Sequence, residues 1–415
     1  MIESRICSFA AGRFCTESQE EGTPIVQVAS LFNQLLQHFP RTEFGALVKK
    51  HEAERCAKGF GCWTQLVSML FCQLAHADSL REICNGLSCC LGKLIHLGIG
   101  KAPNKSTLSY ANEHRPAKLY EDLFYTALQR FREGEGLGPR RKRFRFRNKL
   151  LSLDSTTLTL CLELFPWARF RRTKGGVKAH VLLDHDDYLP RYVLITEASR
   201  SDVRMADVFA LNPGSIVVMD RGYNDYALFG KWTVEEIYFV TRLKENAAYE
   251  MVQECAVPQN RKILSDQLIR FTGDRAQKDC PCLLRRVVVW DAVNEREIIL
   301  LTNLLAFAAT TVAAIYKDRW QIELFFKALK QNLKVKSFVG TSENALRIQI
   351  WTALIAILLL KWLHHLSKAK WSLSNLASML RLNLFTYRDL QAWLHEPFGT
   401  PPLLPHSQQL TLGLA

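Results

Sequence analysis

The change in hydrophobic periodicity near residue 150 constrains the fold of this 415-residue chain more than any other feature of its sequence. From Ser30 to about Phe131 the apolar residues recur three and four positions apart, which is the spacing of a helix face. After residue 150 they form continuous or alternating runs, which are typical of strands. The sequence therefore predicts an all-α N-terminal part followed by a mixed α/β part.

Five strands are expected in the first part of the α/β region. Their apolar runs begin near Leu150, Val177, Tyr192, Ser215 and Tyr238. The first three are interpreted as successive antiparallel strands, and helices are expected at 203–211 and 224–232. Residues 246–303 interrupt this order with two further strand-like runs, so they are interpreted as an inserted, mainly β segment. From there to about Trp393 the pattern is again helical.

The net charge indicates the class of partner. The chain has 54 Lys and Arg against 40 Asp and Glu, a formal net charge of +14, which favours nucleic acid or an anionic membrane surface. The longest apolar run, 351–360, is shorter than the roughly 20 residues that a membrane span needs. The first residues lack the apolar core of a secretory signal. A cytoplasmic protein that binds DNA, and no membrane, is therefore predicted.

A glycine-rich and then basic segment separates the two parts. Residues 133–139 contain three glycines and a proline, and residues 140–149 contain seven basic residues and no acid. The first stretch predicts a linker, and the basic side chains are expected to contact DNA phosphates. The residues predicted to do so are Arg140, Arg141, Lys142, Arg143, Arg145 and Arg147. A solvated, charged hinge is the alternative.

A short polar helix that ends near His114 or Arg115 follows two apolar helices in the N-terminal part. This order is similar to a helix-turn-helix DNA reader, in which the last helix enters a groove. Ser106 is expected to cap the polar helix, and Ser106, Thr107 and Asn112 are expected to face DNA. A plain helical bundle with a solvated last helix is the alternative.

Two aspartates stand at strand positions. Asp154 lies within the first apolar run, where a carboxylate is costly unless a cation or hydrogen bonds compensate. Asp220 follows the run that begins at Ser215. Phosphoryl transfer between DNA strands can use two divalent ions, which need carboxylate oxygens as ligands. Taken alone, either aspartate could be an ordinary turn or cap residue.

A third carboxylate belongs to a polar stripe on a predicted helix. Tyr316, Arg319, Glu323 and Lys330 fall within a sector of about 60° at the helical period. Lys330 lies roughly 10 Å along the axis from Glu323, too far to share one metal centre. Glu323 is therefore the predicted metal ligand, and Tyr316, Arg319 and Lys330 are predicted phosphate contacts. A surface stripe of favourable ion pairs is the alternative.

In combination these motifs resemble a known family. The pattern Tyr-x2-Arg-x3-Glu-x6-Lys is similar to the C-terminal signature of bacterial DDE transposases of the insertion-sequence "four" family. The segments 153–156 and 218–223 resemble those around the family's first and second aspartates, and the second includes an Asp-Arg pair that adds Arg221 to the predicted DNA contacts. Residues 30–130 resemble the helical N-terminal domain of one branch of the family.

The resemblance implies an RNase H-like catalytic core: a mixed five-stranded sheet flanked by helices, with an inserted mainly β segment and an all-α N-terminal domain. It implies that Asp154, Asp220 and Glu323 are the catalytic residues and hold two Mg²⁺ ions, for which Mn²⁺ can substitute. It further implies binding to double-stranded DNA, both transposon ends and target, by a homodimer associated with the nucleoid. Trp290 in the inserted segment is a candidate for holding a flipped base, with a core position as the alternative.

The expected division of the chain has five parts. They are a flexible arm (1–27), a helical DNA-binding domain (28–132), a basic linker (133–149), an RNase H-like catalytic domain (150–395, with its inserted segment at about 246–303) and a C-terminal tail (396–415). The predicted function is cleavage at terminal inverted repeats followed by strand transfer. Two alternatives remain open: an inactive relative that only binds DNA, and a nuclease that hydrolyses nucleic acid without joining it.

Overall fold

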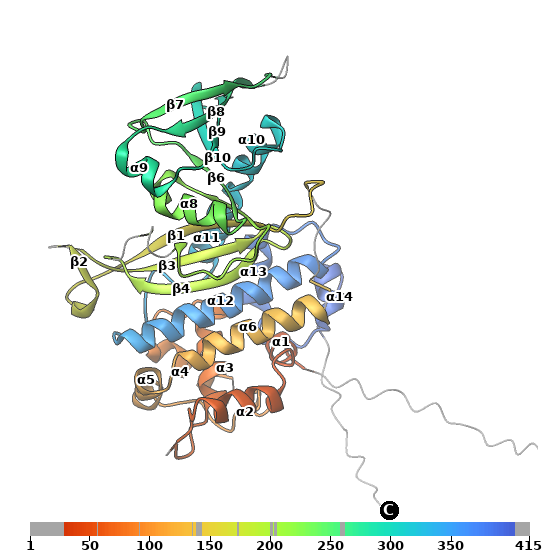
Figure 1. The fold of residues 1–415 in the computed structure, drawn as a ribbon. Coiled ribbons are helices and arrows are strands. Elements are labelled where there is room, and N and C mark those ends of the chain that lie inside the picture. The colour runs from red at the N-terminus through yellow and green to blue at the C-terminus, as the bar shows by residue number, and fades with distance from the viewer. Residues whose placement is uncertain are drawn as a thin grey trace, which may run out of the picture.

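The structure is a computed structural model that describes residues 29–402, except for residues 56, 91, 135, 138–142, 172–173, 200–201, 203–205 and 258–261. Figure 1 shows a layer of helices beneath a long, twisted sheet that carries helices of its own. The expected arm at 1–27, most of the expected tail at 396–415, part of the expected helix at 203–211, and the residues Arg140, Arg141 and Lys142 lie outside the described residues.

Helices fill the described N-terminal part. They are α1 (Leu31–Leu36), α2 (Arg41–Lys50), α3 (Cys62–Ala75), α4 (Leu80–Ser88), α5 (Lys105–His114) and α6 (Lys118–Glu133). At the start of α4 the Ser79 hydroxyl accepts a hydrogen bond from the Glu82 N–H (3.1 Å) and so satisfies one of the free N–H groups of a helix end. Ser106 is not the N-cap of α5 as predicted, because α5 already begins at Lys105 and its N-cap is Asn104.

The C-terminal part is also helical. Its helices are α10 (Ala309–Asp318), α11 (Trp320–Asn332), α12 (Glu343–Leu366), α13 (Leu373–Asn383) and α14 (Leu390–His395). By length and composition alone α12 could cross a membrane, but 89% of its most apolar window is buried inside the protein. A helix that is apolar on all sides needs neighbours on all sides, and α12 finds them in α3, α5 and α6.

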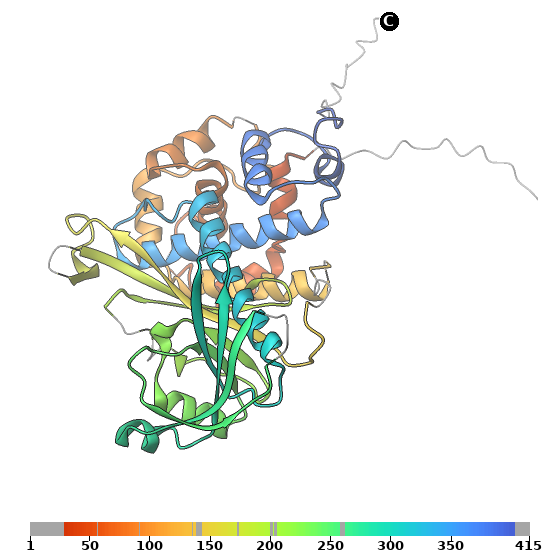
Figure 2. The ribbon, with the colours of Figure 1, turned by 90° about the horizontal axis from the view of Figure 1, so that it is seen from above.

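Both ends of the described chain therefore contribute to one apolar core. Phe131 of α6 stacks on Trp362 of α12 with ring centres 5.1 Å apart. Phe32 of α1 contacts Phe385, which follows α13, at 5.9 Å. Figure 2 shows the same arrangement from above, with the first and last helices packed together. The N-terminal helices and α11 to α14 consequently form a single layer, whereas α10 packs on the sheet with β6, β8 and β9.

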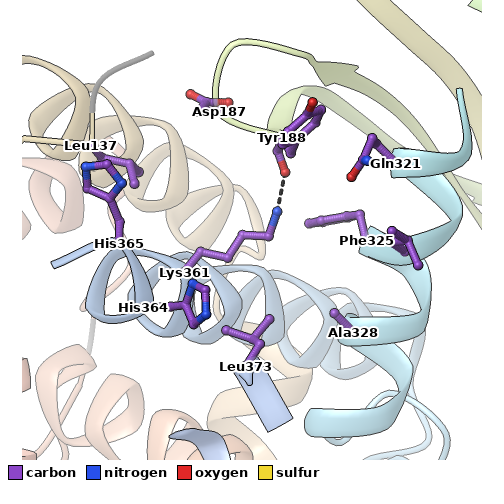
Figure 3. A pocket seen from close by; sticks show the side chains of 11 residues that line it. Leu137, Asp187, Tyr188, Gln321, Phe325, Ala328, Lys361, His364, His365 and Leu373 are labelled. Carbon is purple, nitrogen blue, oxygen red and sulfur yellow. Dashed lines mark hydrogen bonds between the residues drawn. The ribbon is translucent and has the colours of Figure 1, made fainter. Parts of the chain in front are cut away.

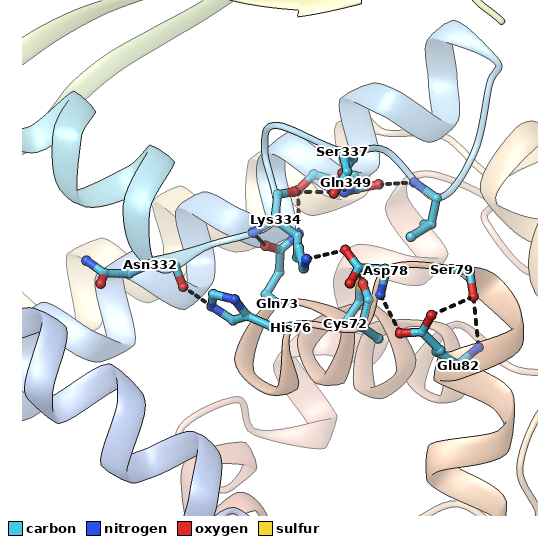
Figure 4. A network of polar contacts seen from close by, with 12 residues as sticks. Cys72, Gln73, His76, Asp78, Ser79, Glu82, Asn332, Lys334, Ser337 and Gln349 are labelled. Carbon is cyan, nitrogen blue, oxygen red and sulfur yellow. Dashed lines mark hydrogen bonds and ion pairs between the residues drawn. The ribbon is translucent and has the colours of Figure 1, made fainter.

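A polar network joins this layer to the segment that follows α11 (Figure 4). The Lys334 N–H donates to Gln73 Oε1 of α3 (2.9 Å), and its ammonium group pairs with Asp78. Gln349 of α12 donates to the Lys334 carbonyl (2.8 Å), and the His76 ring contacts the Asn332 carbonyl. These contacts fix the end of α11 against α3.

Ten strands of the described chain form one sheet. They are β1 (Leu150–Leu160), β2 (Arg169–Arg171), β3 (Lys174–Asp184), β4 (Leu189–Glu197), β5 (Ile216–Met219), β6 (Tyr238–Arg242), β7 (Tyr249–Glu254), β8 (Ile263–Phe271), β9 (Leu284–Asp291) and β10 (Arg296–Thr302). The shorter helical elements of this region are η1 (Pro166–Ala168), η2 (Arg221–Tyr223), α8 (Tyr226–Val234) and α9 (Asp274–Asp279).

The pairing of the strands gives a mixed sheet with β1 and β5 near its centre. The expected antiparallel order is confirmed, since β3 pairs antiparallel with both β1 and β4. Parallel pairs join β1 to β5 and β5 to β6. The sheet has more strands than the five expected, because β10 of the inserted segment pairs with β6 and so continues the same sheet through β9, β8 and β7.

Alternation along β1 decides which side chains meet which helices. Leu151 and Leu153 belong to the apolar cluster that contains α8, whereas Leu150 packs with α10 on the opposite face. Since successive side chains of a strand point to opposite faces, Ser152 and Asp154 share the face of Leu150. This face carries α10 and α11, so the fold places Asp154 opposite the helices that contain the predicted polar stripe.

Candidate active site

Two of the three predicted acids come from neighbouring strands. Leu153 of β1 is the register partner of Met219, the last residue of β5. Asp154 is the next residue of β1, and Asp220 directly follows β5 with an extended backbone. Adjacent strands lie about 4.8 Å apart, and the alternation along both strands directs the two carboxylates to the same face. The Asp154 side chain is largely buried there, with 16% of its surface exposed.

The third acid is brought to the same place through Arg319. Its Nη1 lies 3.0 Å from Asp154 Oδ2 and 3.5 Å from Glu323 Oε1. The stripe that the sequence placed on one helix is carried by two, because α10 ends at Asp318, α11 begins at Trp320, and Arg319 is the residue between them. The guanidinium group therefore stands between one carboxylate of the sheet and one of the helix.

Charge and burial set the protonation of this cluster. The pKa of Asp154 is raised to about 6, chiefly by burial and also by nearby Glu323, although the Ser155 N–H and Arg319 act in the opposite direction. Burial by itself lowers the pKa of Arg319, but Tyr316 and the acids Asp154, Asp220 and Glu323 outweigh it, so the net pKa is raised. One guanidinium is thus within electrostatic range of all three predicted acids.

The donor set fits a divalent cation in its chemistry. Carboxylate oxygens are the ligands that Mg²⁺ prefers, and a buried carboxylate such as Asp154 is costly without a nearby cation. Within the described part of the chain, no three His, Cys, Asp or Glu side chains are gathered as tightly as a bound ion requires. Arg319 contacts both Asp154 and Glu323 and supplies a positive charge beside them.

The other predicted contacts near the cluster differ in exposure. Tyr316 is 8% exposed, and its ring lies beneath Arg242 and Arg319 at 5.6 and 5.9 Å. The Lys330 ammonium donates to the Thr157 carbonyl of β1 (3.4 Å), three residues beyond Asp154. Arg221, in η2 after Asp220, has a side chain that is 58% exposed and pairs with Glu245 at 3.3 Å. The structure thus brings Tyr316 and Lys330 toward the carboxylates and leaves Arg221 at the surface.

The described arginines of the linker are all exposed, but one of them has a protein partner. Arg143, Arg145 and Arg147 each face solvent. Arg143, whose side chain is 49% exposed, also pairs with the buried carboxylate of Asp318. Phe144 and Phe146 stack at 5.1 Å, and Phe146 packs on Phe307 at 5.3 Å, so the aromatic residues of the linker are held against protein.

The predicted DNA-reading helix α5 is only partly available. Ser106 is exposed and Thr107 is half-buried. Asn112 is 1% exposed, and its side chain accepts a hydrogen bond from Gln65 (2.8 Å). The prediction that Asn112 faces DNA is therefore wrong. Its position four residues after buried Leu108 was the signal in the sequence that places it on the inner face of α5.

Three polar residues near the cluster were not predicted from the sequence. Ser152 and Asp318 are buried, His185 lies between them, and hydrogen bonds connect all three. Ser152 shares a strand face with Asp154, which is the one local signal that could have identified it. The other two lie 33 and 166 positions away from Ser152, and no periodicity pairs residues so far apart.

A pocket of about 350 Å³ opens beside α11 but does not contain the carboxylates (Figure 3). Phe325 and Ala328 of α11, Lys361 and His364 of α12, and Tyr188 contribute to its lining. Lys361 points across it to the Tyr188 carbonyl. Phe325 lies two residues, or about 200°, around the helix from Glu323, so this pocket is on a different side of α11 from the three acids.

Comparison with known proteins identifies two matching families. The family described as "Transposase DDE domain" matches residues 145–359, and the "Domain of unknown function (DUF4372)" matches residues 27–100. "Putative transposase y4zB" of Sinorhizobium fredii is 32% identical over 73% of this chain and 83% of its own length. "Probable transposase for insertion sequence element IS5377" of Geobacillus stearothermophilus is 33% identical over 56% of this chain and 62% of its own length. "Transposase InsG for insertion sequence element IS4" of Escherichia coli is 22% identical over 36% of this chain and 34% of its own length.

Proposed function

This chain belongs to the DDE transposases of bacterial insertion sequences, enzymes that cleave DNA and transfer strands, and we propose that Asp154, Asp220 and Glu323 are its catalytic residues. The observation that carries the proposal is that Asp154 of β1 and Glu323 of α11 contact the guanidinium of Arg319, and that Asp220, directly after β5, raises the pKa of the same guanidinium together with them. Although up to 169 positions separate them in the chain, all three lie within electrostatic range of this one guanidinium.

The three carboxylates would hold two Mg²⁺ ions, for which Mn²⁺ can substitute, and the ions would activate the attacking oxygen and stabilise the leaving one. Arg319 stands between Asp154 and Glu323, so it would leave these acids and bind a DNA phosphate as a planar, charged donor. The Lys330 ammonium of α11 reaches Thr157 of β1, three residues beyond Asp154, and would bind the DNA backbone on that side. Tyr316 supports Arg319 from beneath.

The strand order supports an RNase H-like arrangement for the core. The antiparallel strands β1, β3 and β4, the parallel strands β5 and β6, and α11 against β1 form that core. The inserted segment at about 246–303 lies between β6 and α10. We assign the catalytic domain to residues 150–395 and the DNA-binding domain to residues 28–132, joined by the linker 133–149.

Double-stranded DNA is the proposed partner, both as transposon ends and as target. Exposed Arg145, Arg147 and Arg221, together with Ser106 and Thr107 of α5, are the described side chains that support this. Hydrolysis at the element's ends would free a 3′-hydroxyl that then attacks target DNA. A homodimer acting at the nucleoid would hold the two ends together, since both must be cut and joined at one site.

The test uses the full-length protein and a DNA duplex that carries the ends of its own element. Mg²⁺-dependent cleavage is expected from the wild type and is expected to be lost in Asp154→Ala, Asp220→Ala and Glu323→Gln. Asp274→Asn, an exposed aspartate of α9, is the matched control and should cleave normally. Cleavage that persists in all three variants would refute the assignment of these acids.

The same preparation separates the two alternatives. A pre-cut end with a free 3′-hydroxyl is mixed with plasmid DNA, and joined products are measured. Joining is expected of a transposase, whereas cleavage without joining would select a nuclease. Binding of the ends without metal-dependent cleavage by the wild type would select an inactive DNA-binding relative.

A further inference from the structure

A chain of polar contacts runs from the linker to the buried face of β1. The guanidinium of Arg143 pairs with Asp318 Oδ1. Asp318 Oδ2 lies 2.7 Å from His185 Nδ1, and His185 Nε2 lies 2.6 Å from the Ser152 hydroxyl. An ionised carboxylate can only accept, so Nδ1 carries the ring proton and donates it to Asp318, and Nε2 accepts from Ser152.

This Ser-His-Asp order does not serve as a hydrolytic triad. Ser152 is 0% exposed and lies on a strand that is paired on both edges, with Leu183 on one side and Val218 on the other. A substrate carbonyl cannot reach its hydroxyl. The contacts must therefore act on the protein itself.

Two members of this chain of contacts, Ser152 and Asp318, are adjacent to the candidate active site. Ser152 lies two residues before Asp154 on the same face of β1, and Asp318 directly precedes Arg319 at the junction of α10 and α11. Contacts that hold Asp318 against Ser152 therefore fix the distance between β1 and the start of α11. That distance sets how far Glu323 and Arg319 stand from Asp154.

Burial makes this arrangement rigid. The Asp318 side chain is 1% exposed and that of His185 is 5% exposed. A buried carboxylate is costly unless it is paired and hydrogen-bonded, and here Arg143 supplies the charge and His185 the second bond. Arg143 is the one partner that comes from outside the catalytic fold, because it belongs to the linker between α6 and β1.

We propose that Ser152, His185 and Asp318 are positioning residues for the carboxylates, and that Arg143 completes them as a structural cation and is not a DNA phosphate contact. This inference rests on the proposed function, because it takes Asp154, Asp220 and Glu323 to be the metal ligands. It corrects the expectation that every arginine of the linker meets DNA.

The direction in which Arg143→Gln changes Mn²⁺ affinity distinguishes a positioning role of Arg143 from a purely electrostatic one. Removing a positive charge near a cation site should by itself leave Mn²⁺ binding unchanged or strengthen it. If Arg143 positions the ligands, Arg143→Gln should weaken Mn²⁺ binding in spite of the lost positive charge. Groups that orient metal ligands typically change metal affinity by roughly 10- to 100-fold when removed, and we expect about tenfold here.

The experiment titrates Mn²⁺ alone into the full-length protein without DNA and measures the free ion. Arg143→Gln, His185→Gln and Ser152→Ala should each weaken binding, whereas Arg143→Lys, which keeps the charge, should recover it. Arg145→Gln removes the same charge from another exposed arginine, two positions along the linker, and it should not weaken binding. Asp318 is left unchanged, because loss of a negative charge would weaken cation binding on its own.

DNA binding gives the second readout. Arg145→Gln should lower the slope of log affinity against log salt for a short duplex by about one, and Arg143→Gln should leave that slope unchanged. Thermal unfolding of each variant shows whether it is folded at the assay temperature. If His185→Gln does not fold, Ser152→Ala and Arg143→Gln carry the test.

Two results would separate the inference from its premise. If Glu323→Gln weakens Mn²⁺ binding while Arg143→Gln and Ser152→Ala bind as tightly as the wild type, the positioning role is refuted and the proposed ligands stand. If Glu323→Gln leaves Mn²⁺ binding unchanged, the proposed ligands are refuted and the positioning role is refuted with them.

Discussion

Replacing Asp154 by asparagine should stabilise the metal-free protein while it removes activity. Burial raises the pKa of Asp154 from 3.8 to about 6. The folded state therefore holds this proton more tightly than the unfolded chain does. Ionisation costs no stability below pH 3.8, where both states are protonated, and the full cost is present above about pH 6. A shift of about two pKa units corresponds to about 3 kcal/mol.

An asparagine side chain is neutral at every pH, so Asp154→Asn should recover this cost at pH 7.5 and about half of it at pH 5. The assay is thermal unfolding of the full-length protein without metal at both values. We expect the Tm of the variant to exceed that of the wild type by roughly 5 °C at pH 7.5, and by clearly less at pH 5. Mg²⁺ should raise the Tm of the wild type more than that of the variant.

Asp274→Asn is the control, since this exposed aspartate of α9 gains nothing from losing its charge. The reasoning fails if Asp154→Asn melts at or below the wild-type Tm at pH 7.5. It also fails if the difference between the two proteins is the same at pH 5, because the gain would then have a cause other than ionisation.

Three further changes test the packing of the sheet and of the helices that cover it. Gly230→Ala should cost about 1–3 kcal/mol in thermal unfolding, because its new Cβ would lie 2.2 Å from the Asp279 carbonyl oxygen and force α8 away from α9. Burial lowers the pKa of His180 to about 4. The protein therefore loses up to about 3 kcal/mol of folding stability as the pH falls from about 6.5 toward 4. His180→Gln should reduce this loss, which is measured by unfolding followed by circular dichroism. Asp266→Ala should cost about 3–5 kcal/mol in urea unfolding, because it leaves Arg285 buried without its partner at 2.6 Å.

Local patterns in the sequence were sufficient to predict most elements of secondary structure. The apolar alternation around Asp154 placed it on a central strand, and the run before Asp220 predicted the strand that pairs with it. Helical spacing brought Arg319 and Glu323 to one side. These features depend on residues a few positions apart, so they can be predicted without knowing any contact between distant segments.

Contacts between distant segments required the tertiary structure. Arg143 and Asp318 are separated by 175 positions, and their pairing connects a residue of the linker to the α10–α11 junction. β10 joins the inserted segment to the central sheet through β6, which no turn signal indicated.

The sequence by itself determined which residues carry charge and on which face of a strand or helix they lie, because side-chain period is a local property of the backbone. The tertiary structure decided which of those faces meet. In the folded protein Asn112 is buried, Arg319 contacts two acids, and α12 packs at the centre of the N-terminal helices. Local patterns alone do not determine these features, because burial depends on packing across the whole molecule.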